Sequence, residues 1–363
     1  MSVTVVVGGQ YGSEGKGKVC AHLALTDGVD VMVRCGGPNS GHTVQTESKC
    51  YELRQIPAGF INPATRLLLA PGALIEPTLF LHEVDLCGLG PDRVGIDVNA
   101  GIIERADQDA ERSAELRARL GSTGVGVGAA VSRRVLRSPD FRRAADVPEL
   151  KPFLTEVSGE VSKAVAAGRS IVIEGTQGFG LSLYHTELWP FCTSRDTTAH
   201  SFLGEVGLGV RDFEVIMAIR TYPIRVGGNS GPLPRELTWE EIRHRSGYPH
   251  SIEEYTTTTK RLRRVADFSW DVIDRAVAAN SPTQLAVHGV DYLDFSNKRA
   301  KSFADLTDQA KDFISALEER TEVPVTLVGT GPDIDEIIDL RVNQASRKLT
   351  SREVKTTSRR VAV

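Results

Sequence analysis

Residues 3–18 read VTVVVGGQYGSEGKGK, an apolar run followed by a glycine-rich segment with two lysines. The β-branched run at 3–7 is typical of a buried strand, and the residues from Lys16 onward are typical of a helix. A glycine-rich turn between a strand and a helix aligns backbone N–H groups, and the helix adds its positive N-terminal end. The segment therefore predicts a phosphate-binding loop, with a ligand-free glycine turn as the alternative.

This loop differs from the Walker A motif in two respects. The spacing from Gly9 to Gly15 is one residue too long, and Gly17 stands where that motif carries the Ser or Thr that binds magnesium. We therefore expect the loop to bind the phosphates of a nucleotide in a different arrangement.

The composition is that of an ordinary soluble protein. Of the 363 residues 40% are hydrophobic and 25% charged, and the net charge of −4 argues against a general affinity for nucleic acid. No apolar run reaches membrane-spanning length. The five cysteines are scattered and odd in number, which favours reduced thiols over disulfides or a zinc site. We expect a soluble, cytoplasmic protein.

Short β-rich runs alternate with helical periods along the chain. They predict an α/β fold, a single large domain on a central, mostly parallel sheet with long functional loops. A helical spacing of apolar residues at 306–317 precedes the last run. The candidate strands are residues 3–7, 170–173, 214–219, 284–287 and 325–328.

We assign residues 1–340 to the catalytic domain and residues 341–363 to a basic C-terminal tail. The tail holds seven Lys and Arg residues against one acid, Glu353. This pattern favours a solvated tail over a binding segment.

Further segments combine glycine turns with hydroxyl, amide or basic side chains. Two of them have ordinary explanations when taken alone. His42 is then a structural histidine, and residues 256–264 are a solvated basic loop or a nucleic-acid patch. The acidic chain and the missing interleaved aromatics count against that patch. Hydroxyls beside arginines suit a carboxylate or phosphate. The segments are PNSGHT (38–43), GSTGVGVG (121–128), EGTQG (174–178), TSRDTT (193–198), TTTTKRLRR (256–264) and GTGPD (329–333).

Taken in order, these segments resemble the adenylosuccinate synthetase family, along residues 3 to about 340. GQYGSEGKGK resembles that family's GQWGDEGKGK, PNSGHT its NAGHT, GSTGVGVG its GTTGRGIG and IEGTQG its FEGAQG. VGGNSGPLPREL resembles VGAGPFPTEL, TTKRLRR resembles TTGRRRR, and GTGPD resembles STGPD. The compact spacing is similar to the archaeal and phage forms.

The resemblance implies a reaction in which a nucleoside triphosphate phosphorylates O6 of inosine monophosphate and the amino group of aspartate displaces the phosphate at C6. Ser13, Lys16 and His42 would be the catalytic residues, and magnesium would be bound at Ser13 and at the Gly41 carbonyl. The donor nucleotide would contact Gly12, Glu14, Gly15, Gly17, Lys18, Asp291, Gly329, Thr330, Gly331 and Pro332. The purine monophosphate would contact Ser13, Asn39, Thr123, Gln177, Thr193 and, from the neighbouring subunit of a homodimer, Arg133. The aspartate carboxylates would be held by Thr258, Thr259, Arg261 and Arg263.

The chain departs from the family at two positions. Ser13 replaces the aspartate that takes the N1 proton of the purine, and a serine hydroxyl cannot act as that base unaided. Gly289 replaces the lysine that, with the aspartate matched by Asp291, recognises guanine of GTP. Both changes resemble the phage branch that makes 2-aminoadenylosuccinate for 2-aminoadenine (Z) DNA.

We therefore expect a ligase that joins L-aspartate to C6 of dGMP with Mg²⁺ and ATP or dATP. Shortening the aspartate to Ser13 makes room for the 2-amino group of guanine. Two groups remain candidates for the base that removes the N1 proton: the carboxylate of the incoming aspartate and a magnesium-bound water. Ordinary adenylosuccinate synthetase, using inosine monophosphate and GTP, is the first alternative, and a non-catalytic nucleotide-binding regulator is the second. No nucleic acid or membrane partner is expected, and a phage-encoded enzyme would act in the host cytoplasm.

Overall fold

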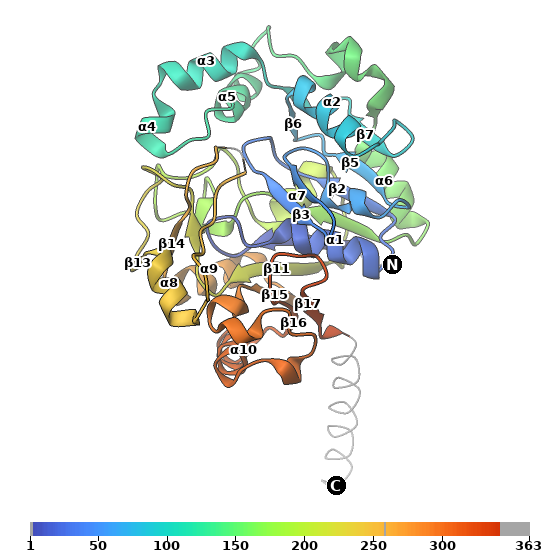
Figure 1. Cartoon of the computed structure of the whole chain (residues 1–363). Coiled ribbons are helices and arrows are strands. Elements are labelled where there is room, and N and C mark those ends of the chain that lie inside the picture. Colours follow the sequence, from blue (N-terminus) through green and yellow to red (C-terminus); the bar gives the residue numbers. More distant parts are fainter. Residues whose placement is uncertain (1–2, 258, 342–363) are drawn as a thin grey trace, which may run out of the picture.

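The structure, a computed structural model, describes residues 3–257 and 259–341 (Figure 1). Its centre is a ten-stranded sheet in the order β17-β16-β15-β11-β1-β10-β2-β5-β7-β9. All neighbouring strands are parallel except β16 and β17, so the predicted α/β fold with a mostly parallel sheet is confirmed. The strands are β1 (Val3–Gly8), β2 (Val31–Arg34), β5 (Arg66–Leu69), β7 (Val94–Asp97), β9 (Leu154–Thr155), β10 (Ile171–Glu174), β11 (Glu214–Arg220), β15 (Gln284–His288), β16 (Val325–Gly329) and β17 (Ile337–Asp339).

Three small sheets stand apart from the central one. They pair β12 (Ile224–Arg225) and β13 (Glu236–Leu237) with β14 (Arg264–Ala266), β3 (His42–Gln45) with β4 (Cys50–Leu53), and β6 (Leu74–Ile75) with β8 (Gly101–Ile102). Short 3₁₀ turns connect the elements at η1 (Ala58–Ile61), η2 (Ala144–Asp146), η3 (Pro148–Phe153), η4 (Phe179–Leu181), η5 (Val290–Tyr292), η6 (Phe295–Asn297) and η7 (Phe303–Asp305).

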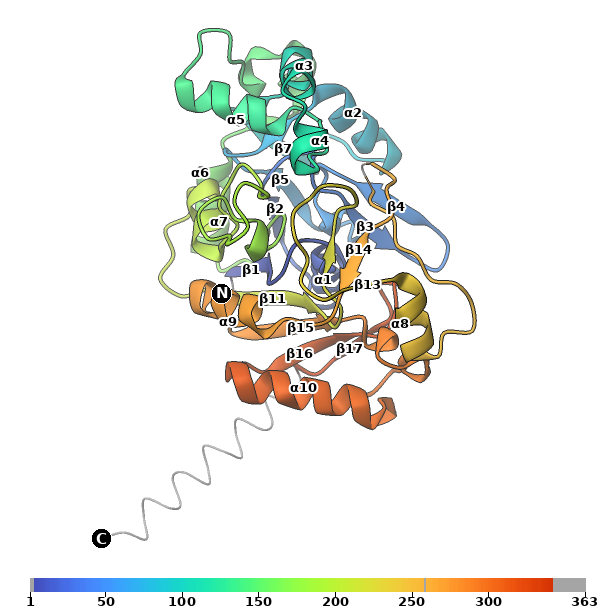
Figure 2. The ribbon, with the colours of Figure 1, turned by 90° about the vertical axis from the view of Figure 1, so that its left-hand side faces the viewer.

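The helices lie around this sheet, with α3, α4 and α5 at one end of the molecule and α10 at the other (Figures 1 and 2). None of those in residues 3–257 and 259–341 has the length and apolar character needed to cross a membrane. They are α1 (Lys16–Thr26), α2 (Pro77–Leu86), α3 (Arg105–Ser113), α4 (Leu116–Leu120), α5 (Val127–Leu136), α6 (Val157–Ala166), α7 (Ala199–Val206), α8 (Trp239–Ser246), α9 (Trp270–Asn280) and α10 (Asp308–Thr321).

Both faces of the sheet are buried, which explains why the strands read as unbroken apolar runs. In β1, Val5 and Val7 pack into a core shared with α6, α7, α9 and α10, and Val6 packs into a second core shared with α1, α2 and η1. Parallel strands with helices on both faces have no solvent-exposed side to carry alternating polar residues.

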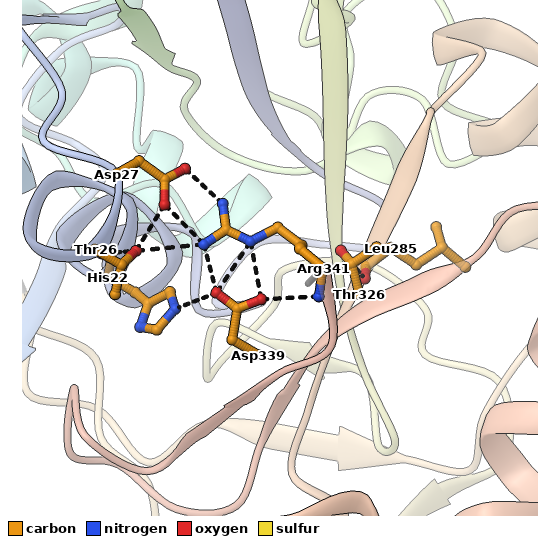
Figure 3. Close-up of polar contacts among 7 residues, drawn as sticks. All are labelled: His22, Thr26, Asp27, Leu285, Thr326, Asp339 and Arg341. Carbon is orange, nitrogen blue, oxygen red and sulfur yellow. Dashed lines mark hydrogen bonds and ion pairs between the residues drawn. The ribbon is translucent and has the colours of Figure 1, made fainter. Parts of the chain in front are cut away.

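A network of ions holds the last described residue against α1. The Arg341 guanidinium lies 2.6 Å from Asp27 Oδ2 and also contacts Asp339, which lies 3.1 Å from the ring of His22 (Figure 3). Burial would raise the pKa of Asp339, but the hydrogen bonds from His22 and Arg341 outweigh it and hold the pKa well below its usual range. The edge strand β17 is thereby tied to the helix that follows the phosphate loop. The remainder of the predicted basic tail, residues 342–363, lies outside the described residues.

Candidate active site

The carboxyl ends of the parallel strands bring charged residues together. Arg34, Glu174, Arg220 and His288 are the last residues of β2, β10, β11 and β15, and the loop after β1 enters between them. Glu174 is in register with Arg34, and Arg220 with His288. This edge is where open α/β sheets bind ligands.

Two cavities meet at the glycine-rich loop. The phosphate-loop cavity, of about 430 Å³, is lined by Ser13 and the start of α1. The amide cavity, of about 360 Å³, is lined by Tyr11 on the other side of the loop. The first collects the predicted residues Ser13, Glu14, Gly15, Lys16, Gly17, Lys18, Gly41, His42, Arg263, Asp291, Gly331 and Pro332, and the second collects Asn39, Thr123, Gln177 and Thr193.

The loop turns through left-handed backbone conformations. Gly12 and Gly15 have φ values of 89° and 87°, which glycine adopts without steric penalty. Ser13 between them has φ 61° and is exposed to the cavity. Among residues other than glycine this region favours Asp and Asn, so serine has no conformational advantage here.

Glu14 stabilises the loop from inside. Its fully buried carboxylate accepts hydrogen bonds from the backbone N–H groups of Gln10 and Gly12, and its second oxygen lies 2.7 Å from Lys16 Nζ. Lys16 also donates to the Gln177 carbonyl. The Glu14 carboxylate is therefore engaged within the loop. The contact with the donor phosphates predicted for Glu14 can still be made by its backbone.

Gly17 is required by the neighbouring histidine. A Cβ at Gly17 would lie 2.7 Å from His42 Cβ, which explains why this loop has no Ser or Thr there. His42 Nδ1 lies 3.0 Å from Glu174 Oε1, and Arg34 Nη1 lies 2.6 Å from the same oxygen. Burial would raise the pKa of Glu174, but His42 and Arg34 lower it to about 2. Glu174 thus orients the ring, and His42 Nε2 is buried without a partner among the described residues.

A second, partly buried ion cluster borders Ser13. Glu254 forms ion pairs with Arg220 and with Arg263, whose Nη1 lies 2.7 Å away. Arg220 also donates to the Ser13 carbonyl over 3.3 Å. Burial would raise the pKa of Glu254, but the two arginines lower it to about 2. The cluster fixes the backbone of Ser13 and supplies positive charge at the cavity wall.

The other predicted aspartate-binding residues are spread more widely than Arg263. Arg261 lines a neighbouring open cavity of about 670 Å³ beside α3 and α4. The Thr259 hydroxyl lies 2.6 Å from that of Thr256. Thr258 lies outside the described residues. The structure brings together only part of the predicted clamp.

At the opposite end of the phosphate-loop cavity, Asp291 is buried and accepts a hydrogen bond from the Tyr248 hydroxyl. Burial raises the pKa of Asp291. Gly289 has φ 79°, a conformation that is strained for a lysine. Lys298, which the sequence did not single out, lines the same cavity.

The remaining predicted donor residues have structural contacts. Lys18 Nζ donates to the Gly331 carbonyl over 2.6 Å and to the Glu336 carbonyl over 2.9 Å, and burial lowers its pKa to about 8. Thr330 is fully buried. Gly329 packs against the His288 ring, and Gly12 lies beside Leu181.

Arg133 does not reach either cavity. It forms two hydrogen bonds of 2.7 Å to the carboxylate of Asp107, and these raise its pKa. Arg137, at the C-terminal end of the same helix, is exposed and has no side-chain partner among the described residues. Two exposed apolar residues, Val135 and Leu136, precede it.

The described residues contain no cluster of three or more His, Cys, Asp or Glu side chains able to hold a metal ion. The Gly41 carbonyl and the Ser13 hydroxyl belong to residues that line one cavity. This sparse oxygen set suits magnesium, which takes one or two protein ligands and completes its shell with phosphates and water.

Sequence reasoning missed Arg34, Arg220, His288 and Lys298 and did not assign a role to Glu174. Except for Lys298, each is a charged or polar residue that ends a buried apolar run. That position was an available signal, because parallel strands end at one edge of the sheet.

Comparisons with known proteins agree with this geometry. The family described as adenylosuccinate synthetase matches residues 5–147 and 140–298. The adenylosuccinate synthetase of Archaeoglobus fulgidus is 41% identical over 94% of this chain and 99% of its own length. That of Pyrococcus horikoshii is 42% identical over 94% and 99%.

Two solved structures share the fold. The fully ligated adenylosuccinate synthetase of Plasmodium falciparum superposes with a TM-score of 0.81 at 20% identity, covering 93% of this chain and 100% of the other. The succinoaminodeoxyadenylate synthetase of cyanophage S-2L, bound to dGMP and to dATP as energy donor, superposes with a TM-score of 0.78 at 28% identity. It covers 93% of this chain and 95% of its own.

Proposed function

The chain belongs to the adenylosuccinate synthetase family, and we propose that it joins L-aspartate to C6 of dGMP with ATP or dATP as phosphoryl donor. As a member of this family it is a nucleoside-triphosphate-dependent ligase that forms a C–N bond between aspartate and a purine nucleotide. The proposed product is the 2-amino-2′-deoxy-N6-succinyladenylate of the phage branch.

Ser13 is the observation that carries the proposed acceptor. Ser13 lines the phosphate-loop cavity, and Tyr11, two residues earlier in the same loop, lines the amide cavity in which we place the purine nucleotide. An aspartate there would place a carboxylate beside the base edge that carries the 2-amino group of guanine. Serine is shorter, and its hydroxyl accepts a hydrogen bond from that amine. The likeness to the dGMP-binding cyanophage enzyme supports the same acceptor.

The residues of the phosphate-loop cavity suit phosphoryl transfer to O6. Such transfer depends on positioning and charge neutralisation more than on covalent help. Lys16 and the loop N–H groups would hold the transferred group, and His42 Nε2, oriented by Glu174, would stabilise charge on O6. Magnesium, carried by the donor phosphates, would neutralise their charge, with the Gly41 carbonyl and Ser13 hydroxyl as its protein ligands.

Three of the carboxylates that line the phosphate-loop cavity with Ser13 are already engaged. Glu14 accepts loop N–H groups, Glu174 is paired with His42 and Arg34, and Glu254 is paired with two arginines. With pKa values of about 2, Glu174 and Glu254 are poor bases at neutral pH. We propose that the N1 proton leaves to the carboxylate of the substrate aspartate or to a magnesium-bound water.

The donor preference rests on Gly289. Without a lysine side chain at this position, the contact that reads guanine is missing, which favours an adenine donor. Lys298 lies on the same cavity wall as Asp291, so a lysine from another position can still approach the donor base. GTP is for this reason compared with ATP and dATP as a donor.

Ordinary adenylosuccinate synthetase activity is the second candidate. Overall similarity favours it, because archaeal enzymes of that name are 41–42% identical across nearly the whole chain, against 28% for the cyanophage enzyme. Ser13 is the local feature that opposes it.

We further propose a homodimer in which an arginine of α5 reaches the partner's purine monophosphate. Because Asp107 engages Arg133, the exposed Arg137 one turn later is better placed for this contact. Mixing Arg137→Ala subunits with Lys16→Ala subunits should restore activity in the mixed dimer. Absence of restored activity in a confirmed mixed dimer would exclude Arg137 as the arginine that acts across the interface.

A substrate panel tests the proposed function. The purified protein is offered dGMP, GMP or IMP with aspartate, Mg²⁺ and ATP, dATP or GTP. The succinyl product and the nucleoside diphosphate formed from the donor are measured. We expect product from dGMP with ATP or dATP. Turnover of IMP with GTP and no turnover of dGMP would support the second candidate. Nucleotide binding without release of a nucleoside diphosphate would indicate a regulator.

A further inference from the structure

Arg225 is a buried cation without a carboxylate partner. It ends β12, beside Arg264 of β14, and only 2% of it is exposed. Its Nη2 donates to the carbonyl oxygens of Phe191, over 3.1 Å, and Ser230. Its Nε and Nη1 are buried and have no partner among the described residues. A guanidinium buried with unmet donors is unfavourable unless an anion completes its contacts.

The position of Arg225 points to a ligand. Its guanidinium carbon lies 4.9 Å from the ring centre of Tyr11, and it lines the amide cavity with Asn39, Thr123 and Gln177. Among the described residues that line this cavity it is the one cation. Burial lowers its pKa to about 10, so the side chain remains charged at neutral pH.

Other anion-binding features of the cavity are already satisfied. The N-terminus of α5 borders it, but the Glu111 carboxylate accepts the N–H groups of Gly126 and Gly128 over 2.9 Å and 2.8 Å. Glu111 is also the one acidic residue of the described lining. Nη2 of Arg225 is already taken by the Phe191 and Ser230 carbonyls, but Nε and Nη1 stay available, and each can donate a charge-assisted hydrogen bond to a phosphate oxygen.

We propose that Arg225 binds the phosphate group of the purine monophosphate in the amide cavity, within its own subunit. The inference rests on the proposed function in that a purine monophosphate is the acceptor. It does not depend on whether that acceptor is dGMP or IMP, because both carry the same phosphate. The neutral base has no charge to match the guanidinium, whereas the phosphate carries between one and two negative charges.

Isothermal titration calorimetry tests the contact. For each protein the phosphate contribution is the ratio of the dissociation constants of 2′-deoxyguanosine and dGMP, and the ratio for inosine and IMP is measured in parallel. In Arg225→Met we expect this ratio to fall at least about 30-fold relative to the unchanged protein. Arg225→Lys, which keeps the charge but loses the two free guanidinium donors, should show a smaller fall.

Arg264→Met is the matched control. Arg264 pairs with Arg225 across the strands and bonds the same loop, through Ser230 Oγ and the Gly231 carbonyl, but does not line the cavity. Its ratio should stay unchanged. If Arg225→Met weakens the binding of the nucleoside and of the monophosphate equally, Arg225 has a purely structural role and the proposal is overturned. If that variant fails to fold, an unchanged ratio in Arg225→Lys would overturn it.

If the unchanged protein binds IMP more tightly than dGMP, the dGMP proposal fails, and the inosine and IMP pair still decides the role of Arg225.

Discussion

Ser13 and Glu174 show how single residues set the chemistry of this site. Ser13 keeps the left-handed backbone of the loop but brings a hydroxyl to the cavity instead of a carboxylate. Glu174 holds His42 and Arg34 at once. In the proposed function Ser13 contacts the purine base, and Glu174 orients the histidine that faces O6.

Replacing Glu174 with glutamine should slow catalysis. The amide keeps the size but loses the charge that pairs with His42, so we expect kcat to fall about 100-fold with a smaller change in KM. Steady-state kinetics measure both, and unfolding in urea should show a loss of about 3–5 kcal/mol from the broken buried pair. An unchanged kcat would contradict the orienting role of Glu174.

The pH dependence follows from the lowered pKa of Glu174. Because its pKa is about 2 in the folded protein and about 4.3 in an unfolded chain, its stabilisation is fully present above pH 4.3. It is lost as the pH falls from about 4 to 2. In Glu174→Gln this part of the acid-induced loss of stability should be absent.

Strand ends explain what the sequence could and could not predict. Strands were predicted at 170–173, 214–219, 284–287 and 325–328, and each continues one residue further, to Glu174, Arg220, His288 and Gly329. The apolar pattern stops where the site begins, so the pattern that found the strands left out these residues. Of the four-residue strands in the central sheet, β10 was predicted and β2, β5 and β7 were missed, because apolar runs this short are only sometimes distinctive.

Ion pairs of Arg341 connect the edge strand β17 to α1. Arg341→Met removes the ion pairs with Asp27 and Asp339, and we expect the free energy of unfolding to fall by about 1.5–3 kcal/mol at pH 7. Because the pKa of Asp339 is depressed, the difference should shrink as the pH falls below about 4. Urea unfolding at pH 7 and pH 3 measures it.

Arg320→Met is the control for this pair. Arg320 contacts Asp274 over 2.7 Å, but both side chains are more than 40% exposed. We expect a much smaller change in the free energy of unfolding, because solvent screens this exposed pair. Equal losses in the two variants would show that the network at α1 has no special part in stability.

At the scale of the whole molecule, the fold places two cavities on either side of one loop. The residues predicted for the acceptor nucleotide, Asn39, Thr123, Gln177 and Thr193, gather in one, and most of those for the donor gather in the other. The motifs predicted these groups because each follows a strand or opens a helix. The separate placement of Arg261 and the pairing of Arg133 with Asp107 depend on packing between distant segments, which no local pattern contains.

The central claim is that Ser13 adapts the family's acceptor site to a 2-aminopurine. The most direct measurement is the ratio of kcat/KM for dGMP to kcat/KM for IMP, with ATP, in the unchanged protein and in Ser13→Asp. We predict a ratio above one in the unchanged protein and a fall of at least about tenfold in the variant, which corresponds to about 1.4 kcal/mol. A ratio below one in the unchanged protein, or the same ratio in both proteins, would contradict the claim.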